Sequence, residues 1–385
     1  MIEAFQSATE QVLNPYAAEW VQEGKKVVGY TCNFVPGEIL HAANILPYRL
    51  RGHGTESLDI ADAYYGPFVC SFPKCLLQLI GEGKYKFLDG AIITTSCDSV
   101  RRLNDNWRSV AKDIPDILPA FFHYLGAPYK VVPHSVEWYI KELKMLIEHL
   151  ESHFGVSITE EKLKKSIEAY NVSRQLLTEL DEFRIAEEVI LSGADMYTVV
   201  LAGTVMPRDM YNDHLERLLA KVKEKRPPVM SGRKRIMVAG SICDDAELIS
   251  LIEDAGAVVV AEGLCFGIRG LADRVRLDGD PLVALAERYM EENTCPRFIM
   301  SYDKRVTFLH DKAERARAQG VVFQNVRFCE FHGSENSLLE SGFEEVGIPA
   351  VRLEREFGPL NETGRVRLRV DALLNRISEK STTAE

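Results

Sequence analysis

The chain has 385 residues, of which 46% are hydrophobic and 27% are charged, a balance typical of a globular protein with room for two domains. Its formal net charge of −11 argues against a nucleic-acid partner, because a surface that tracks phosphates needs clustered lysine and arginine. No apolar run reaches the roughly 18 residues that span a bilayer, and the polar N-terminus lacks the layout of a secretory signal. We therefore expect a cytoplasmic protein without a membrane partner.

Apolar runs typical of buried strands alternate with amphipathic stretches in the first third of the chain. Strands are predicted there at 26–31, 46–50, 90–95, 121–124 and 130–132. A helix is predicted over 38–43, with Pro36 suited to its first turn. The run at 90–95, GAIITT, is apolar on both faces, which indicates a strand of a parallel sheet.

The pattern becomes helical after residue 136. The first long helix is predicted to end at Gly155, and Thr159 is a suitable N-cap for the next one. Helical periodicity continues to Glu224, and the charged, proline-bearing stretch 221–230 is typical of a linker.

A second α/β region follows the linker. Strands are predicted at 235–239, 257–261, 321–323 and 348–353, and helices at 246–254, 281–293 and 365–377. The chain therefore divides into an N-terminal α/β domain over 1–155, a helical connecting region over 156–230 and a C-terminal α/β domain over 231–385.

The two α/β regions repeat one pattern. VVGYTC in the first is matched by IMVAGSIC in the second, and DGAIITTSCD is matched by QGVVFQNVRFCE. In each case a strand ends close to a cysteine and an acidic residue follows. Two pairs in the same order suggest duplicated open-sheet α/β domains, and such sheets bind ligands at the carboxyl ends of their strands.

The eight cysteines are the residues that most suggest chemistry. Reduced thiols are expected in the cytosol, so a disulfide framework is improbable. Cys97 and Cys329 follow predicted strands, and they would converge if the two domains face each other across a cleft. Cys70 lies in an aromatic loop that leads into a helix at Leu76, and the backbone dipole favours a thiolate near a helix N-terminus.

Three distant cysteines suit a cubane iron–sulfur cluster with one iron left open. Structural zinc prefers four ligands at short spacing, and the chain has no C-x2-C. It also lacks the phosphate loop G-x4-G-K-S/T and a nicotinamide-type G-x-G-x-x-G after a strand. Two alternatives stay open: buried cysteines that only pack, and a cysteine nucleophile paired with one of His41, His53, His310 or His332.

Several segments together resemble subunits of the 2-hydroxyacyl-CoA dehydratase and benzoyl-CoA reductase family. The N-terminal part of the resemblance is VGYTCNFVPGEILHAANILPYRL, followed by VCSFPK at Cys70 and LDGAIITTSCDSVRRLNDNW at Cys97. The C-terminal part comprises VAGSICDD, EDAGAVVVAEGLCFGIRG, GVVFQNVRFCEF at Cys329 and the ending IPAVRLEREFG. The order and spacing of these segments cover nearly the whole chain.

The resemblance implies two flavodoxin-like domains with added helices and an oxygen-sensitive [4Fe-4S] cluster between them. By position, the cluster ligands correspond to Cys70, Cys97 and Cys329. It also implies three partners: a homologous second subunit, an ATP-hydrolysing iron–sulfur activator and an acyl-CoA substrate. Single electrons would pass from the cluster to the thioester, either in the dehydration of a 2-hydroxyacyl-CoA or in the reduction of an aromatic acyl-CoA.

Glu38 and His41 are the catalytic candidates. Glu38 matches the glutamate of the family's P-x-E segment, and His41 is placed one helical turn later. Glu38 could transfer protons or orient the substrate, or it could simply be a first-turn carboxylate favoured by the helix dipole. His41 could equally be a surface or interfacial histidine. Asp98 and Glu330, which follow two of the cysteines, are candidates for helix caps.

Three questions stay open at this stage. The five other cysteines, Cys32, Cys75, Cys243, Cys265 and Cys295, allow the larger double-cubane cluster of another family branch. The chain could be a non-catalytic electron-relay or partner subunit of the same complex. A metal-free protein that binds CoA thioesters is the third reading.

Overall fold

Two parallel sheets with the same strand order form the framework of the protein. The structure is a computed structural model that describes residues 2–224, 228–270, 274–358 and 363–383. The first sheet has the order β2-β1-β3-β4, and its strands are β1 (Val27–Tyr30), β2 (Leu46–Arg49), β3 (Gly90–Thr94) and β4 (Phe121–Leu125). The second has the order β6-β5-β7-β8, and its strands are β5 (Lys234–Gly240), β6 (Ala257–Gly263), β7 (Gly320–Val326) and β8 (Ala350–Arg355). The predicted α/β class with duplicated flavodoxin-like sheets is confirmed.

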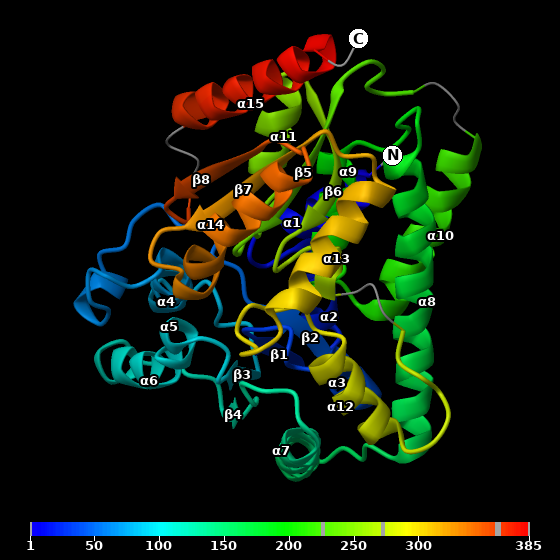
Figure 1. The fold of residues 1–385 in the computed structure, drawn as a ribbon. Helices are drawn as coiled ribbons and strands as arrows, with labels where there is room; N and C mark the ends of the chain where they lie inside the picture. The colour runs from blue at the N-terminus through cyan, green and yellow to red at the C-terminus, as the bar shows by residue number, and fades with distance from the viewer. Residues whose placement is uncertain (1, 225–227, 271–273, 359–362, 384–385) are drawn as a thin grey trace.

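Helices cover the faces of both sheets, as parallel pairing requires. Every residue of β3, β6 and β7 is buried, which explains why these strands do not alternate between apolar and polar residues. Figure 1 shows the first sheet in the lower half of the molecule and the second sheet in the upper half. The helices before the first long one are α1 (Glu3–Thr9), α2 (Pro15–Gln22), α3 (Gly37–Ala42), α4 (Ser71–Gly81), α5 (Asp98–Arg101) and α6 (Leu103–Asp113).

The central region is helical, as predicted. Helix α7 (Pro133–Phe154) ends at Gly155, whose φ of 66° is the left-handed conformation that glycine adopts easily. Thr159 caps α8 (Glu160–Ile185), because its hydroxyl accepts the backbone N–H of Lys162 at 3.3 Å. Helices α9 (Gly193–Ala202) and α10 (Arg208–Glu224) follow, and residues 225–227 of the predicted linker lie outside the described residues.

The strand predicted at 130–132 is wrong. The chain bends there and enters α7 directly, and no strand in the described part of the chain pairs with these residues. Proline at the first helical position has a backbone already suited to a helix, so Pro133 starts α7 at once. The helix after Cys70 was predicted to begin at Leu76, but α4 already begins at Ser71.

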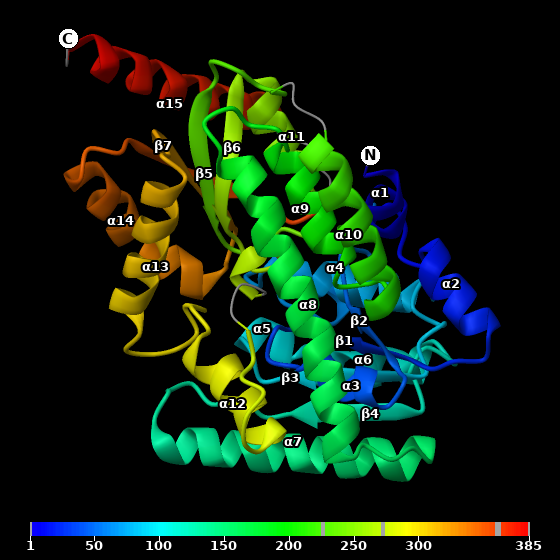
Figure 2. The ribbon, with the colours of Figure 1, turned by 90° about the vertical axis from the view of Figure 1, so that its right-hand side faces the viewer.

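The C-terminal part of the chain returns to the first sheet. Its helices are α11 (Glu247–Asp254), α12 (Pro281–Glu291), α13 (Tyr302–Arg315), α14 (Glu330–Glu345) and α15 (Thr363–Thr383). Leu285 and Met290 of α12 belong to the same apolar cluster as Val28 and Ile92 of the first sheet. Figure 2 shows α12 just above α7, next to the first sheet. The division at 155 and 230 stays a prediction.

The two sheets meet near the carboxyl ends of their strands. Asp244, which follows β5, is fully buried, and its Oδ2 accepts the backbone N–H groups of Gly52 at 2.6 Å and His53 at 3.0 Å. Arg51, just after β2, donates from Nη2 to the Asp244 carbonyl at 2.7 Å. These bonds hold the ends of the two sheets together. Within the described residues, no helix has the length and apolarity to cross a membrane.

Candidate metal centre

Six of the eight cysteines line a single cavity of about 100 Å³ between the ends of the two sheets. They are Cys32, Cys70, Cys97, Cys265, Cys295 and Cys329. The other two face elsewhere: the Cys75 thiol donates to the Phe357 carbonyl at 3.8 Å, and the Cys243 thiol donates to the Asp245 carbonyl at 3.3 Å. The structure therefore brings the three predicted ligands together and adds three more thiols to them.

Cys70, Cys97 and Cys329 occupy equivalent local positions, and we call them the first thiol set. Each is the N-cap residue of a helix, of α4, α5 and α14 respectively. The Cys97 sulfur accepts the backbone N–H of Val100 at 3.4 Å. Cysteine thus takes the capping place that serine or aspartate usually fills, and first-turn amides point at the sulfur. Asp98 and Glu330 were predicted as caps, but they are the first helical residues instead.

Burial dominates the electrostatics of the first thiol set. It raises the pKa of Cys97 to about 12 and that of Cys329 to about 11, and it raises the pKa of Cys70 well above the ordinary value. Neighbouring thiols add to the effect, because Cys70 is influenced by both Cys329 and Cys97. Backbone amides of the following helices act in the opposite direction. A bound metal would supply the positive charge that stabilises three adjacent thiolates.

Cys32, Cys265 and Cys295 form the second thiol set. Cys32 follows β1, Cys265 follows β6 and Cys295 lies beyond the end of α12. The Cys265 loop is held in place from the first sheet, because the Asn33 amide donates to the Cys265 carbonyl at 2.9 Å. Its own strand helps as well: the buried Glu262 carboxylate accepts the backbone N–H of Leu264 at 3.1 Å.

Cationic side chains distinguish Cys265 from the other thiols. Burial by itself raises its pKa, but the guanidinium groups of Arg49 and Arg269 outweigh burial and lower the pKa below the ordinary value. The Arg49 Nη2 donates to the Cys265 sulfur at 3.3 Å. In contrast, burial and the neighbouring Cys265 raise the pKa of Cys32, and burial raises the pKa of Cys295 to about 11.

The residues around the cavity fit an iron–sulfur cluster. Ser96 Oγ, Arg49 Nε and Arg297 Nε are buried at this cavity, and none has a hydrogen-bond partner in the described part of the chain. Buried donors without partners suit an occupant that offers acceptors, such as inorganic sulfide. Much of the remaining wall is apolar and would exclude water: Phe72, Pro73, Val100, Ile242, Pro296 and Phe331.

A single metal ion fits less well. Among the described residues, no group of three or more His, Cys, Asp or Glu side chains is arranged to hold one ion. In a cluster each thiolate binds a different iron atom, so its ligands stand further apart than those of one ion. Within the described residues, the thiols are therefore not arranged as the compact ligand set of a structural zinc ion.

Glu38 and His41 lie away from the cysteine cavity and are not among its lining residues. Glu38 is fully buried, with Oε1 at 2.5 Å from Arg174 Nη2 and Oε2 accepting the Tyr289 hydroxyl at 2.8 Å. The Nδ1 of His41 lies 2.8 Å from the Ser166 hydroxyl. Burial raises the pKa of Glu38, but Arg174 outweighs it, and the pKa is lowered. These contacts tie α3 to α8 and α12.

The sequence offered the second thiol set only among five further cysteines that could serve a larger cluster, and it did not separate this set from Cys75 and Cys243. Cys32 and Cys265 each follow a strand, which is the signal that identified Cys97 and Cys329. Cys243 carries the same signal but lies outside the cavity, so a strand end alone does not identify a ligand. Cys295 follows a helix and has no local signal at all.

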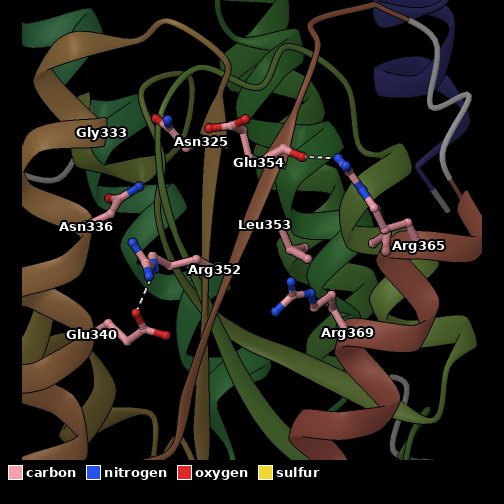
Figure 3. A pocket seen from close by; sticks show the side chains of 10 residues that line it. Asn325, Gly333, Asn336, Glu340, Arg352, Leu353, Glu354, Arg365 and Arg369 are labelled. Carbon is pink, nitrogen blue, oxygen red and sulfur yellow. Dashed lines mark hydrogen bonds and ion pairs between the residues drawn. The ribbon is translucent and has the colours of Figure 1, made fainter.

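A larger cavity, of about 410 Å³, lies at the outer strand β8 between α14 and α15, and Figure 3 shows it from close by. Arg352 and Glu340 form an ion pair of 2.7 Å across it, and Arg365 donates to the Glu354 carbonyl. None of the residues that line it is a cysteine or a predicted site residue. The smaller cysteine cavity therefore remains the candidate site on chemical grounds.

Comparison with known proteins gives a consistent result. The chain matches the family model described as 2-hydroxyglutaryl-CoA dehydratase, D-component, over residues 32–377. A benzoyl-CoA reductase subunit of Thauera aromatica is 27% identical over 347 residues, which cover 87% of each chain. The (R)-phenyllactyl-CoA dehydratase beta subunit of Clostridium sporogenes is 25% identical over 335 residues, also 87% of each chain. The beta subunit of (R)-2-hydroxyglutaryl-CoA dehydratase from Acidaminococcus fermentans is 23% identical over 370 residues, or 93% of this chain and 95% of the relative.

Proposed function

Since the chain belongs to the family of the 2-hydroxyglutaryl-CoA dehydratase D-component, we propose that it is the iron–sulfur subunit of a radical enzyme that acts on acyl-CoA thioesters. Its relatives are named as subunits of dehydratases and of a reductase, so the prediction of an enzyme subunit is confirmed. The observation that carries the proposal is the convergence of six thiols on one cavity between the two sheets.

The first thiol set is the proposed ligand set of a [4Fe-4S] cluster. Cys70, Cys97 and Cys329 would bind three irons, and the fourth would be left open. When bound, such a cluster supplies one electron at low potential. Backbone amides of the following helices would stabilise the thiolates, and the apolar wall would exclude water.

A larger cluster is the second candidate, and a specific observation favours it. Cys32, Cys265 and Cys295 line the same cavity as the first thiol set, and three further thiolates are what a double-cubane cluster would need. With a double-cubane cluster, the chain would be an electron-transferring component of a reductase, and its fold would be the same.

The proposed partners are a homologous second subunit and an ATP-hydrolysing iron–sulfur activator, with an acyl-CoA as the substrate. The names of the relatives as subunits support a complex. We retain Glu38 and His41 as proposed catalytic residues, although their contacts also suit a structural role. An electron-relay subunit is the alternative within the same complex.

Anaerobic purification followed by measurement of iron and sulfide per chain tests the proposal. About four irons are expected for one cubane, and about twice that for the larger cluster. A protein with neither iron nor sulfide would sink both readings. Assays with candidate acyl-CoA substrates, with and without the activator, then separate a catalytic subunit from a relay.

Single cysteine substitutions distinguish the two clusters. Cys70→Ala, Cys97→Ala and Cys329→Ala should each lose iron under either reading, whereas Cys295→Ala should lose it only with the larger cluster. Cys75→Ala is the matched control, because this buried thiol faces away from the cavity. Full iron content in Cys97→Ala would contradict the ligand assignment.

A further inference from the structure

The two thiol sets differ in the charges that surround them. Guanidinium groups act to lower the pKa of every thiol in the second set. Arg49 and Arg297 act on Cys32, Arg49 and Arg269 act on Cys265, and Arg269 acts on Cys295. The pKa values of Cys70, Cys97 and Cys329 are shifted mainly by burial, by other thiols and by backbone amides. The Glu330 carboxylate also raises the pKa of Cys329. The three guanidinium groups that line the cavity therefore act mainly on the second thiol set.

Arg49 is held rigidly against the second thiol set. It is 2% exposed, and its Nη2 and Nη1 donate to the sulfur and the carbonyl of Cys265, both at 3.3 Å. The guanidinium stacks over the Phe266 ring at 3.5 Å. Arginine stays protonated under all ordinary conditions, so this charge is permanent.

Two more arginines complete the cationic side. Arg269, 9% exposed, lines the cavity together with Cys265, and its positive charge lowers the pKa of that thiol. Arg297, 1% exposed, donates to the Pro128 carbonyl at 2.6 Å and stacks over Tyr129 at 3.9 Å. Water screens buried charges poorly, so these groups act more strongly than surface arginines would.

We propose that Arg49 and Arg269 are positioning residues for an added electron. Their positive charges stabilise that electron on the side of the cavity that holds Cys32, Cys265 and Cys295. This inference rests on the proposed function. Reduction by a one-electron donor adds one negative charge to the centre, and fixed cations and N–H donors beside the sulfurs favour that reduced form. No proton has to enter, because the compensating charge is already present. The arginines therefore raise the reduction potential of the centre.

An anaerobic redox titration followed by electron paramagnetic resonance tests the inference on the iron-loaded protein, with dithionite as the reductant. Arg49→Gln and Arg269→Gln should each make the potential more negative. We expect a roughly tenfold loss in the equilibrium for reduction, which is about 59 mV for a one-electron couple. Arg49→Lys keeps the charge and should recover part of the shift.

Arg101→Gln is the matched control. Arg101 belongs to α5, which Cys97 caps, but it is exposed and pairs with Asp98 at 3.2 Å, so its loss should leave the potential unchanged. Unchanged potentials in both glutamine variants at full iron content would overturn the inference. Loss of iron from both variants would also overturn it, because the arginines would then hold the centre and not tune it. An iron-free wild-type protein would instead refute the proposed function.

Discussion

Cys97 and Cys329 each combine two tasks that are usually separate. They are the N-cap residues of the helices that follow β3 and β7, and both line the shared cavity; the Cys97 sulfur also accepts the backbone N–H of Val100. A cap fixes the side chain relative to the helix axis, so the thiol is positioned before any metal binds. The same position at the ends of equivalent strands of both sheets explains how a duplicated fold places thiols on two sides of one cavity.

Glu38 is the residue whose removal should affect stability most directly. Glu38→Ala leaves Arg174 buried without its partner, which typically costs 3–5 kcal/mol. Chemical denaturation at pH 7 measures the loss. Glu160→Ala removes an exposed pair with Lys164 and should cost less than about 1 kcal/mol. A loss of that small size in Glu38→Ala would show that the buried pair is not structural.

His123 should make the protein sensitive to acid. Burial, and then the neighbouring His149, lower its pKa to about 4, below the ordinary value of 6.5. Between these two values the unfolded chain binds a proton that the folded chain does not, so stability should fall as the pH drops from 6.5 to 4.

Denaturation midpoints measured across this pH range would show the effect of His123. The variant His123→Gln should show a shallower decline, because it cannot take up that proton. Identical slopes in the two proteins would contradict the role assigned to His123.

At the scale of elements, the end of β5 depends on one glycine. Gly240 has a φ of 126°, and a Cβ there would lie 1.9 Å from the Gln324 carbonyl oxygen of β7. Gly240→Ala should therefore separate the two central strands and cost several kcal/mol, on the order of 3 or more. Thermal unfolding gives the measurement.

Gly342 in α14 provides the control for this substitution. It has no neighbour within 4 Å of an added Cβ and lies inside a helix, where alanine is preferred. Gly342→Ala should leave the protein unchanged or stabilise it by about 0.5–1 kcal/mol. Comparable losses in both variants would indicate that the strand contact is not the cause.

At the scale of the whole molecule, Asp244 holds the two sheets together at the cavity. Asp244→Ala leaves the N–H groups of buried Gly52 and half-buried His53 without their acceptor, which costs about 1–3 kcal/mol at Gly52 and less at His53. Hydrogen exchange should accelerate at these two amides, and Asp244→Asn should restore part of the protection. Asp254→Ala, at an exposed position at the end of α11, is the control. Unchanged exchange in Asp244→Ala would show that other contacts close this junction.

Most predictions of strands and long helices that depended on local pattern were confirmed. Apolar runs identified all the strands of both sheets, and Gly155 and Thr159 marked the helix ends where the structure has them. The repeated strand–cysteine pattern predicted the duplicated fold and two of the three proposed ligands. The strand predicted at 130–132 is absent because a strand forms only beside a pairing partner, and the local sequence does not indicate whether a partner is present.

Contacts between residues far apart in the chain could not be predicted from the local sequence pattern. Arg174 pairs with Glu38 across 136 positions, and α12 crosses to the first sheet. The sequence by itself determined the elements, their duplication and which cysteines stand at strand ends, because these follow from the chemistry of neighbouring residues. Only the tertiary structure decided that Cys32, Cys265 and Cys295 share a cavity with the first thiol set while Cys243 does not. That choice depends on how two sheets pack end to end, and packing joins residues whose spacing along the chain carries no information about their distance.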